Sequence, residues 1–277
     1  MTTAPITTAY GAVTHVGLRR TVNEDSHLAA GPLFLVADGM GGHDAGDLAS
    51  LAVVTEFTPL TTHESLAPAL LDEVLGRARE RVRELPTAHG NAGTTVAAVA
   101  VSHLSGAAHW LTMNVGDSRI YRLRDGELEQ LSTDHSEVQE LIDAGLLDRE
   151  EAASDRRRNV ITRAIGAGSD GVPDFRLLPA AVGDRLLVCS DGLHGEVSNS
   201  AIAAILREQP DPREAATRLV HEALLHGGRD NITVIVVDAL AIADPSEIDQ
   251  AGASDDSDEF GDLDDTRPTR VPGAVRG

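Results

Sequence analysis

The chain has 277 residues, of which 42% are hydrophobic and only 3% aromatic, so it can form one sizeable domain with an aliphatic core. Its formal net charge of −21 argues against a broad electrostatic surface for binding nucleic acid. All 23 basic residues are arginines. The lysine-dependent chemistry of protein kinases, P-loop nucleoside triphosphatases and Schiff-base enzymes is therefore excluded.

The predicted strands are short runs of apolar or β-branched residues bounded by Gly, Asp or Asn. They cover residues 33–37, 94–101, 107–115, 118–123, 185–189 and 232–238. Helical spacing of apolar residues predicts helices within residues 48–55, 66–82, 137–144, 202–206 and 213–225. Asp125-Gly126 is typical of a hairpin turn. Strands and helices that follow one another in runs favour an α+β fold.

The single cysteine, Cys189, excludes an internal disulfide framework and a zinc site with several cysteines. It belongs to an apolar run, and we interpret it as a buried, small apolar residue. No apolar stretch approaches the ~20 residues needed to span a bilayer, and the start of the chain lacks the features of a signal peptide. We therefore expect a cytoplasmic protein without a membrane or nucleic-acid partner.

Several of the apolar runs begin or end at an aspartate that is followed by Gly or Asn, and we call such a pair an acidic corner. Asp38-Gly39 and Asp191-Gly192 each follow such a run, and Asp230-Asn231 precedes one. Each pair alone would also fit an ordinary turn. If the corners converge, however, their carboxylates would repel one another and raise one another's pKa, and hard divalent metal ions would stabilise them. Arg20, just before Glu24-Asp25, would suit a phosphate at such a cluster.

The motifs occur in one order along the chain. They are Arg20-x-x-Asn23-Glu24-Asp25, Val36-Ala37-Asp38-Gly39-Met40-Gly41-Gly42-His43, Val115-Gly116-Asp117-Ser118-Arg119, Ser190-Asp191-Gly192 and Asp230-Asn231-Ile232-Thr233. In this order they strongly resemble the metal-dependent protein phosphatase 2C (PPM) family in its bacterial form, over roughly residues 8–240. The resemblance implies a central β-sandwich of two antiparallel sheets flanked by helices, in four layers α-β-β-α.

The resemblance also implies an activity: metal-dependent hydrolysis of phosphoserine and phosphothreonine in proteins, opposing bacterial serine/threonine kinases. The partners would be phosphoproteins, namely the kinases and their substrates, and we expect a monomer. Two Mn²⁺ or Mg²⁺ ions would activate the attacking water.

By resemblance, Asp38 bridges these two ions, and the Gly39 carbonyl is a further ligand. Asp191 and Asp230 complete the shell of one ion. For the other ion, Glu24 is the ligand and Asp25 supports it. Asp117 matches the position that, with Asp191, holds a weaker third ion. Arg20 matches the phosphate-binding arginine.

One position departs from the eukaryotic pattern. Met40 stands where those relatives carry a histidine that is proposed as the general acid, and a thioether cannot donate a proton. His43, three residues further on, is the candidate general acid; the alternative is a proton supplied by a metal-bound water.

Residues from about 133 to 175 match a mobile flap beside the active site. Within this segment, Arg156, Arg157 and Arg158 would attract phosphorylated or acidic segments of a substrate. The alternative is that they balance the nearby acidic residues Asp148, Glu150, Glu151 and Asp155. We interpret His135, at the start of the flap, as a structural hydrogen-bonding residue.

The chain changes character at about residue 244, where it becomes rich in acidic residues. We interpret residues 1–243 as a phosphatase domain and residues 244–277 as an acidic disordered tail that contributes solubility. Partner docking or regulation by phosphorylation are alternatives for the tail.

Three other functions remain open. The first is a narrow phosphatase of anti-anti-sigma factors, and the second is a pseudophosphatase that binds phosphoproteins without turnover. The third is a calcium-binding module, although the acidic corners lie too far apart in sequence for an EF-hand loop.

Overall fold

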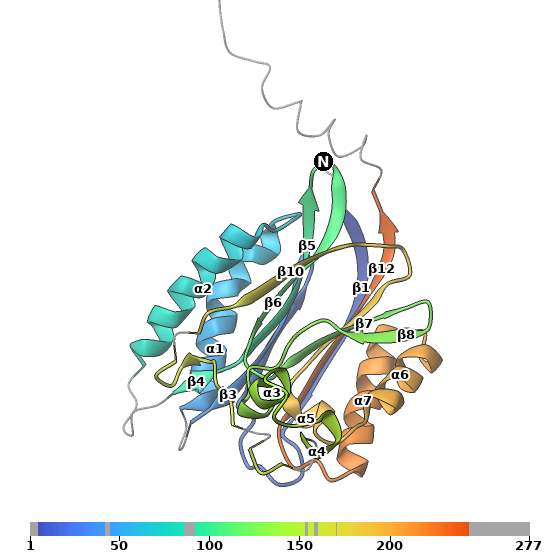
Figure 1. Cartoon of the computed structure of the whole chain (residues 1–277). Helices are drawn as coiled ribbons and strands as arrows, with labels where there is room; N and C mark the ends of the chain where they lie inside the picture. The colour runs from blue at the N-terminus through green and yellow to red at the C-terminus, as the bar shows by residue number, and fades with distance from the viewer. Residues whose placement is uncertain are drawn as a thin grey trace, which may run out of the picture.

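The computed structural model describes residues 5–41, 45–85, 92–152, 155–157, 160–169 and 171–243. They form two antiparallel sheets packed face to face, with helices on both outer faces (Figure 1). Helices α1 (Gly46–Phe57) and α2 (Pro68–Arg83) cover one sheet, and α6 (Asn199–Glu208) and α7 (Pro212–Leu225) cover the other. This arrangement confirms the predicted α+β fold with four layers.

The first sheet runs in the order β1 (Ile6–His15), β12 (Ile232–Ile242), β11 (Arg185–Cys189), β7 (Arg119–Arg124) and β8 (Glu127–Gln130). It has β11 at its centre, and the last strand of the chain, β12, lies between β11 and the edge strand β1. The second sheet runs in the order β10 (Asp174–Pro179), β6 (Ala107–Val115), β5 (Val96–Leu104) and β3 (Leu33–Met40), and β2 (Asp25–Ala30) pairs with β3. Two short strands extend this sheet sideways at the end of β3: β4 (Gly93–Thr94) pairs with Gly39 and Met40, and β9 (Ile165–Gly166) pairs with β4.

The central strands are apolar on both faces because each face contacts a different layer. On β3, Leu33 and Leu35 pack against the α1–α2 layer, whereas Phe34 and Val36 point into the interior of the sandwich. Two-sided burial of this kind produces continuous apolar runs instead of the alternation of a half-exposed strand. Cys189 on β11 is fully buried, as predicted, and burial raises the pKa of its thiol to about 12.

All the predicted strands and helices are present in the structure, with ends that differ by a few residues. The Asp125-Gly126 turn joins β7 to β8, and both residues have positive φ (52° and 81°). The sequence analysis missed β1, β2, β9 and β10, and it indicated β8 only through the hairpin turn before it. These strands are short or half-exposed, and their polar residues mask the apolar pattern.

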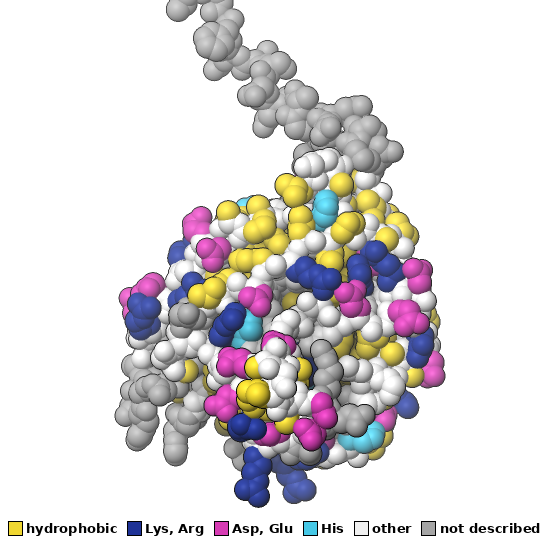
Figure 2. Space-filling view, in the orientation of Figure 1, with side chains coloured by type: hydrophobic (Ala, Val, Ile, Leu, Met, Phe, Trp, Pro, Cys, Tyr) yellow, Lys and Arg dark blue, Asp and Glu magenta, His cyan; other side chains and the backbone are white. Residues whose placement is uncertain are grey.

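The smaller helices are η1 (Thr58–Thr62), α3 (Glu137–Asp143), α4 (Arg149–Ala152) and α5 (Asp191–His194). Helices α3, α4 and α5 lie at the lower end of the sandwich in Figure 1, opposite the N-terminus. Charged side chains of both signs surround this lower end in Figure 2, whereas apolar side chains gather toward the upper end. No helix in the described part of the chain combines the length and the apolar character needed to cross a bilayer. The predicted tail, residues 244–277, lies outside the described residues.

Candidate metal and phosphate site

Four of the predicted carboxylates converge at the lower end of the sandwich. Asp25 and Asp38 face each other on the paired strands β2 and β3 of one sheet. Asp191 follows β11, and Asp230 precedes β12, in the other sheet. Burial raises the pKa of Asp38 well above its usual value, and the charges of the other three aspartates raise it further. Asp38 and Asp191 influence each other's pKa, so two residues that are far apart in sequence are neighbours at this site.

Asp25 connects the two sheets through hydroxyl groups. Its Oδ2 accepts hydrogen bonds from Ser190 Oγ (2.8 Å) and Thr233 Oγ1 (2.7 Å). Its Oδ1 is buried and has no hydrogen-bond partner among the described residues. Burial raises the pKa of Asp25 to about 7, although the two hydroxyl groups oppose that shift. The sequence analysis named Asp25 but missed Thr233, whose side chain needs the β12 register to be placed.

Asn231 ties the loop that carries Arg20 to the Asp230 corner. Its Oδ1 accepts from the Glu24 amide (2.8 Å), and its Nδ2 donates to the carbonyls of Val16 (2.9 Å) and Val22 (3.0 Å). Its own main-chain amide donates to Asp230 Oδ1 (2.8 Å). One buried amide side chain therefore fixes the relative positions of Glu24 and Asp230.

Two glycines allow the start of α1 to approach the Asp38 corner. A Cβ on Gly39 would lie 2.2 Å from the Gly46 carbonyl oxygen, and a Cβ on Gly46 would lie 2.6 Å from Glu24 Oε1. The Gly39 amide donates to the Glu24 carbonyl (3.1 Å). Only residues without a side chain fit at these two positions, which keep Glu24 beside Asp38-Gly39.

Arg20 lies at the rim of the carboxylate group, with 48% of its side chain exposed. Its Nη2 donates to Asp230 Oδ2 (2.8 Å), and its Nη1 is 4.0 Å from Glu24 Oε2. The hydrogen bond to Asp230 raises the pKa of the guanidinium. A cation in this position faces both the carboxylates and the solvent, where it can meet a phosphate group.

Asp117 occupies the buried turn between β6 and β7 and is only 6% exposed. Its Oδ1 has no hydrogen-bond partner among the described residues. Burial, followed by the charges of Asp191 and Asp134, raises its pKa to about 8. Burial also lowers the pKa of His194 to about 3, so this imidazole is neutral and its Nε2 donates to the Asp117 carbonyl (3.0 Å).

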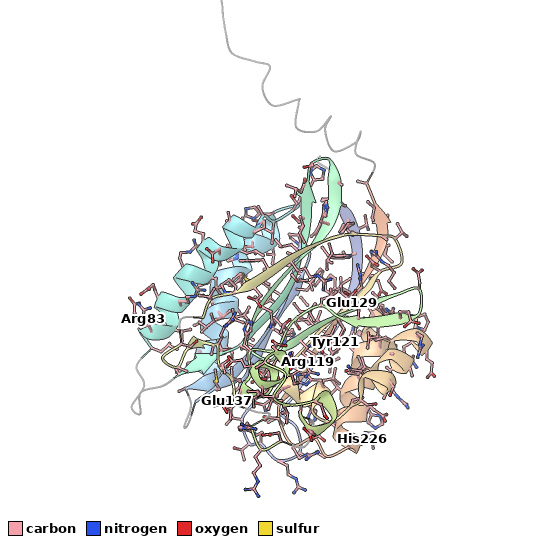
Figure 3. The ribbon with its side chains drawn as sticks, in the orientation of Figure 1. Arg83, Arg119, Tyr121, Glu129, Glu137 and His226 are labelled. Atoms are coloured by element: carbon pink, nitrogen blue, oxygen red, sulfur yellow. The ribbon has the colours of Figure 1, made fainter. Side chains whose placement is uncertain are left out.

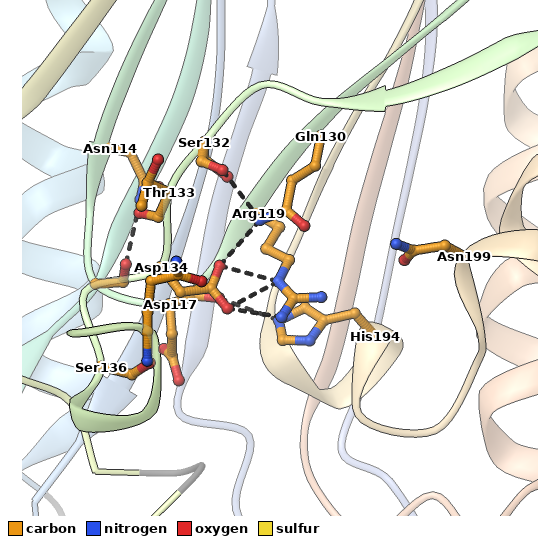
Figure 4. Close-up of polar contacts among 12 residues, drawn as sticks. Asn114, Asp117, Arg119, Gln130, Ser132, Thr133, Asp134, Ser136, His194 and Asn199 are labelled. Atoms are coloured by element: carbon orange, nitrogen blue, oxygen red, sulfur yellow. Dashed lines mark hydrogen bonds and ion pairs between the residues drawn. The ribbon is translucent and has the colours of Figure 1, made fainter. Parts of the chain in front are cut away.

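Arg119 and Asp134 form an ion pair that the sequence analysis did not identify. Arg119 donates to Asp134 through Nε (2.9 Å) and Nη2 (2.6 Å), and through Nη1 to the Tyr121 hydroxyl (3.1 Å) (Figure 4). Figure 3 labels Arg119 and Tyr121, which both lie on β7. Arg119 belongs to a motif quoted above, but the sequence contains no signal that pairs it with Asp134.

His135 attaches the start of the 133–175 segment to the Asp117 turn. Its Nδ1 accepts from the Gly116 amide (3.1 Å), and its Nε2 lies 3.0 Å from Asp174 Oδ2. This geometry fits the predicted structural role. Arg156 and Arg157 are exposed, and Arg157 pairs with Asp155 through Nε (3.0 Å) and Nη2 (2.8 Å). Arg157 is thus balanced locally by an acidic neighbour; His43 and Arg158 lie outside the described residues.

The donor chemistry of this site fits divalent metal ions. Carboxylate oxygens are the ligands that Mg²⁺ and Mn²⁺ prefer. Burial, and to a smaller extent the charges of the neighbouring aspartates, raises the pKa of these groups, and a bound cation would offset both effects. Two of the buried carboxylate oxygens, on Asp25 and Asp117, still have free hydrogen-bonding capacity within the described structure. The carboxylates are close neighbours but not a closed ligand sphere, since no three His, Cys, Asp or Glu side chains of the described residues already surround one metal-sized position.

Comparison with known proteins gives concordant results. The family model for protein phosphatase 2C matches residues 18–225. The serine/threonine protein phosphatase PstP of Mycobacterium tuberculosis is 39% identical over 237 residues, which cover 83% of this chain and 45% of PstP, so the chain spans less than half the length of that relative. The serine/threonine phosphatase stp of Listeria welshimeri is 36% identical over 216 residues, covering 75% of this chain and 84% of that protein.

A solved structure of the PstP catalytic domain in complex with two manganese ions is also similar. It superimposes with a TM-score of 0.74 at 36% sequence identity, covering 84% of this chain and 99% of that domain.

Proposed function

The chain belongs to the protein phosphatase 2C family, and we propose that it hydrolyses phosphoserine and phosphothreonine in proteins by a metal-dependent reaction. The observation that carries the proposal is the convergence of Asp25, Asp38, Asp191 and Asp230 from both sheets beside Arg20. Relatives named as serine/threonine phosphatases support it.

We propose that two Mn²⁺ or Mg²⁺ ions bind at this carboxylate group, as the manganese complex of the PstP catalytic domain suggests. Asp38 would serve both ions, and the Gly39 carbonyl would be a further ligand. Asp191 and Asp230 would complete the shell of one ion, and Glu24, supported by Asp25, would hold the other. Asp117 and Asp191 would hold a weaker third ion. When bound, such ions lower the pKa of water and offset the negative charge of a phosphoryl group.

The side chains of the protein would then position the substrate. Arg20 would bind the phosphoryl oxygens through its planar guanidinium, after exchanging its contact with Asp230 for one with the phosphate. Asn231 would keep Asp230 and Glu24 in register while Arg20 moves. His43 remains the candidate proton donor to the departing alkoxide.

The physiological substrates would be phosphoproteins that serine/threonine kinases produce, including the kinases themselves, and we expect the enzyme to act as a monomer. The phosphatase domain would span residues 1–243, with the flap at about 133–175. Of the two described arginines of the 156–158 run, Arg156 is the better candidate for contacting an acidic substrate segment, because Arg157 is engaged with Asp155.

The proposal is tested by hydrolysis of a phosphothreonine peptide with Mn²⁺, with EDTA and with the variant Asp38→Asn. We expect turnover only with the metal. The variant should lose more than about 100-fold in kcat/KM, because even outer partners of a metal ligand are worth about 10- to 100-fold.

Asp125→Asn is the matched control, since it removes a carboxylate from the hairpin turn at a residue with positive φ that asparagine tolerates. Its activity should equal that of the wild type. A folded wild-type protein that binds Mn²⁺ but hydrolyses no phosphopeptide would favour the pseudophosphatase.

A further inference from the structure

Asp117 and Asp191 lie just beyond the ends of two paired strands. Strand β7 pairs with β11 in antiparallel register, and the ladder ends at the site with the pair Arg119 and Cys189. Asp117 precedes Arg119 by two residues, and Asp191 follows Cys189 by two. Side chains two positions apart along a strand point to the same face, so this register places the two carboxylates opposite each other. After burial, the charge of Asp191 is the largest influence on the pKa of Asp117, which agrees with this placement.

The ladder itself does not fix the spacing of these carboxylates, because both chain segments leave the sheet before they reach them. Strand β7 begins at Arg119, and β11 ends at Cys189. The Ser190 amide turns toward β12 and donates to the Thr233 carbonyl (3.0 Å). Asp191 then begins α5. Another contact is therefore needed to hold the Asp117 turn against α5.

His194 supplies this contact. It is the last residue of α5, and its Nε2 donates to the main-chain carbonyl of Asp117 (3.0 Å) (Figure 4). The same turn of helix starts at Asp191, whose carbonyl accepts from the Gly195 amide (2.7 Å). One helical turn is a short link, so the hydrogen bond of His194 ties the main chain of Asp117 to the segment that carries Asp191.

This hydrogen bond leaves the Asp117 carboxylate available for a metal ion. Only the main chain of Asp117 is used, and its Oδ1 has no hydrogen-bond partner among the described residues. The imidazole of His194 is neutral, because burial and then the charge of Arg119 lower its pKa. A neutral donor can orient the turn without adding a positive charge that would oppose a bound cation.

We propose that His194 is a positioning residue that holds the Asp117 turn against α5 and so sets the spacing of Asp117 and Asp191 for the third ion. The inference rests on the proposed phosphatase function and assigns a role to a further residue of the same site. His194 would contact neither the ion nor the substrate. The ions at Asp38 should depend on it much less, because the buried side chain of Leu193 anchors α5 in the core independently of the Asp117 turn.

The test measures Mn²⁺ binding to the full-length protein without substrate, from the electron paramagnetic resonance signal of free Mn²⁺. Asp117→Asn identifies the weakest class of bound ions. We expect His194→Leu, which removes the donor but keeps an apolar side chain of similar size, to raise the Kd of that class by about tenfold. His194→Gln should keep the wild-type Kd, because its amide nitrogen can donate to the same carbonyl.

Three results of this titration would overturn the proposal. The first is wild-type binding by Asp117→Asn, which would show that no ion depends on this carboxylate. The second is wild-type binding by His194→Leu. The third is an equal loss in His194→Leu and His194→Gln, which would show that the hydrogen bond is not the cause.

A double variant and a core variant separate positioning from general damage. Asp117→Asn combined with His194→Leu should bind the remaining ions as Asp117→Asn alone does, because His194 acts through Asp117. A further loss of these ions would show that His194 acts on the whole site. Leu206→Ala, in the buried core that α5 shares with α6, should lower the melting temperature and keep the wild-type Mn²⁺ affinity. A loss of affinity equal to that in His194→Leu would assign the effect to destabilisation and overturn the proposal.

Failure of the inference can be distinguished from failure of the proposed function, because binding is measured without turnover. If the wild type hydrolyses a phosphothreonine peptide in Mn²⁺ while His194→Leu binds Mn²⁺ as the wild type does, only the role of His194 is wrong. If the wild type binds Mn²⁺ but hydrolyses neither the peptide nor p-nitrophenyl phosphate, the phosphatase function is wrong, and the titrations still decide the role of His194.

Discussion

Burial disfavours the charged form of the aspartates at the site, and a bound metal ion would favour it. Burial is the main reason that the pKa is raised to about 7 for Asp25, about 8 for Asp117 and about 6 for Asp191. In the metal-free protein these carboxyls keep their protons to higher pH when the chain is folded than when it is unfolded, where the pKa is near 3.8. Their stabilising contribution is thus fully present below about pH 4 and is lost as the pH rises through the folded-state values.

We therefore predict that, in EDTA, the melting temperature falls between pH 5 and pH 8, with a cost of at most about 1.4 kcal/mol per group and pH unit. Mn²⁺ should raise the melting temperature more at pH 8 than at pH 5, because the ion binds the deprotonated carboxylates. Thermal unfolding followed by circular dichroism would check both expectations. A melting temperature in EDTA that rises steadily over this range would contradict the assigned shifts.

At the scale of elements, the start of α1 packs against residues of the site as well as against the core. Gly46 has room for no side chain, because a Cβ there would contact Glu24 Oε1 and the Gly39 carbon atom. Gly76, in the middle of α2, has no atom within 4 Å of an added Cβ. Substitution of Gly46 therefore tests a steric requirement of the site, whereas substitution of Gly76 tests helix propensity alone.

We predict that Gly46→Ala raises the Mn²⁺ concentration needed for half-maximal activity by about tenfold, through displacement of Glu24. Gly76→Ala should leave that concentration unchanged and stabilise the protein by about 0.5–1 kcal/mol, because alanine favours the helix. Urea unfolding and metal titration of both variants would check this. An unchanged metal requirement in Gly46→Ala would show that α1 does not position the site.

The elements that could be predicted are those whose burial is complete. Strands β3, β11 and β12 are apolar on both faces and stand out in the sequence, whereas β1 and β10 lie at sheet edges and carry polar residues on their exposed side. In the site, the motif residues Asp38, Asp191 and Asp230 could be named from the sequence. Their partners could not, because the bonds of Asp25 to Ser190 and Thr233 and of Arg119 to Asp134 depend on how strands from different parts of the chain are aligned.

For the whole molecule, the described fold ends with β12, and the amide of Ala243 donates to the Pro5 carbonyl (3.1 Å). This end lies at the top of the sandwich in Figure 1, away from α3, α4 and α5. Deletion of residues 244–277 should therefore leave the melting temperature and the hydrolysis of p-nitrophenyl phosphate unchanged. A large change in kcat for this small substrate would show that the acidic tail acts on the reaction site.

The site draws its carboxylates from both sheets, and Asp25 joins the sheets through Ser190 and Thr233. The metal affinity of the site would then depend on the relative position of the two sheets. Phe34, Val188 and Ile235 belong to the core between the sheets and are not sequence neighbours of the carboxylates of the site. Their packing nevertheless determines the relative position of the two sheets. Substitutions in this core would therefore change the metal concentration that the enzyme needs. Selection for catalysis would then also act on the packing between the two sheets.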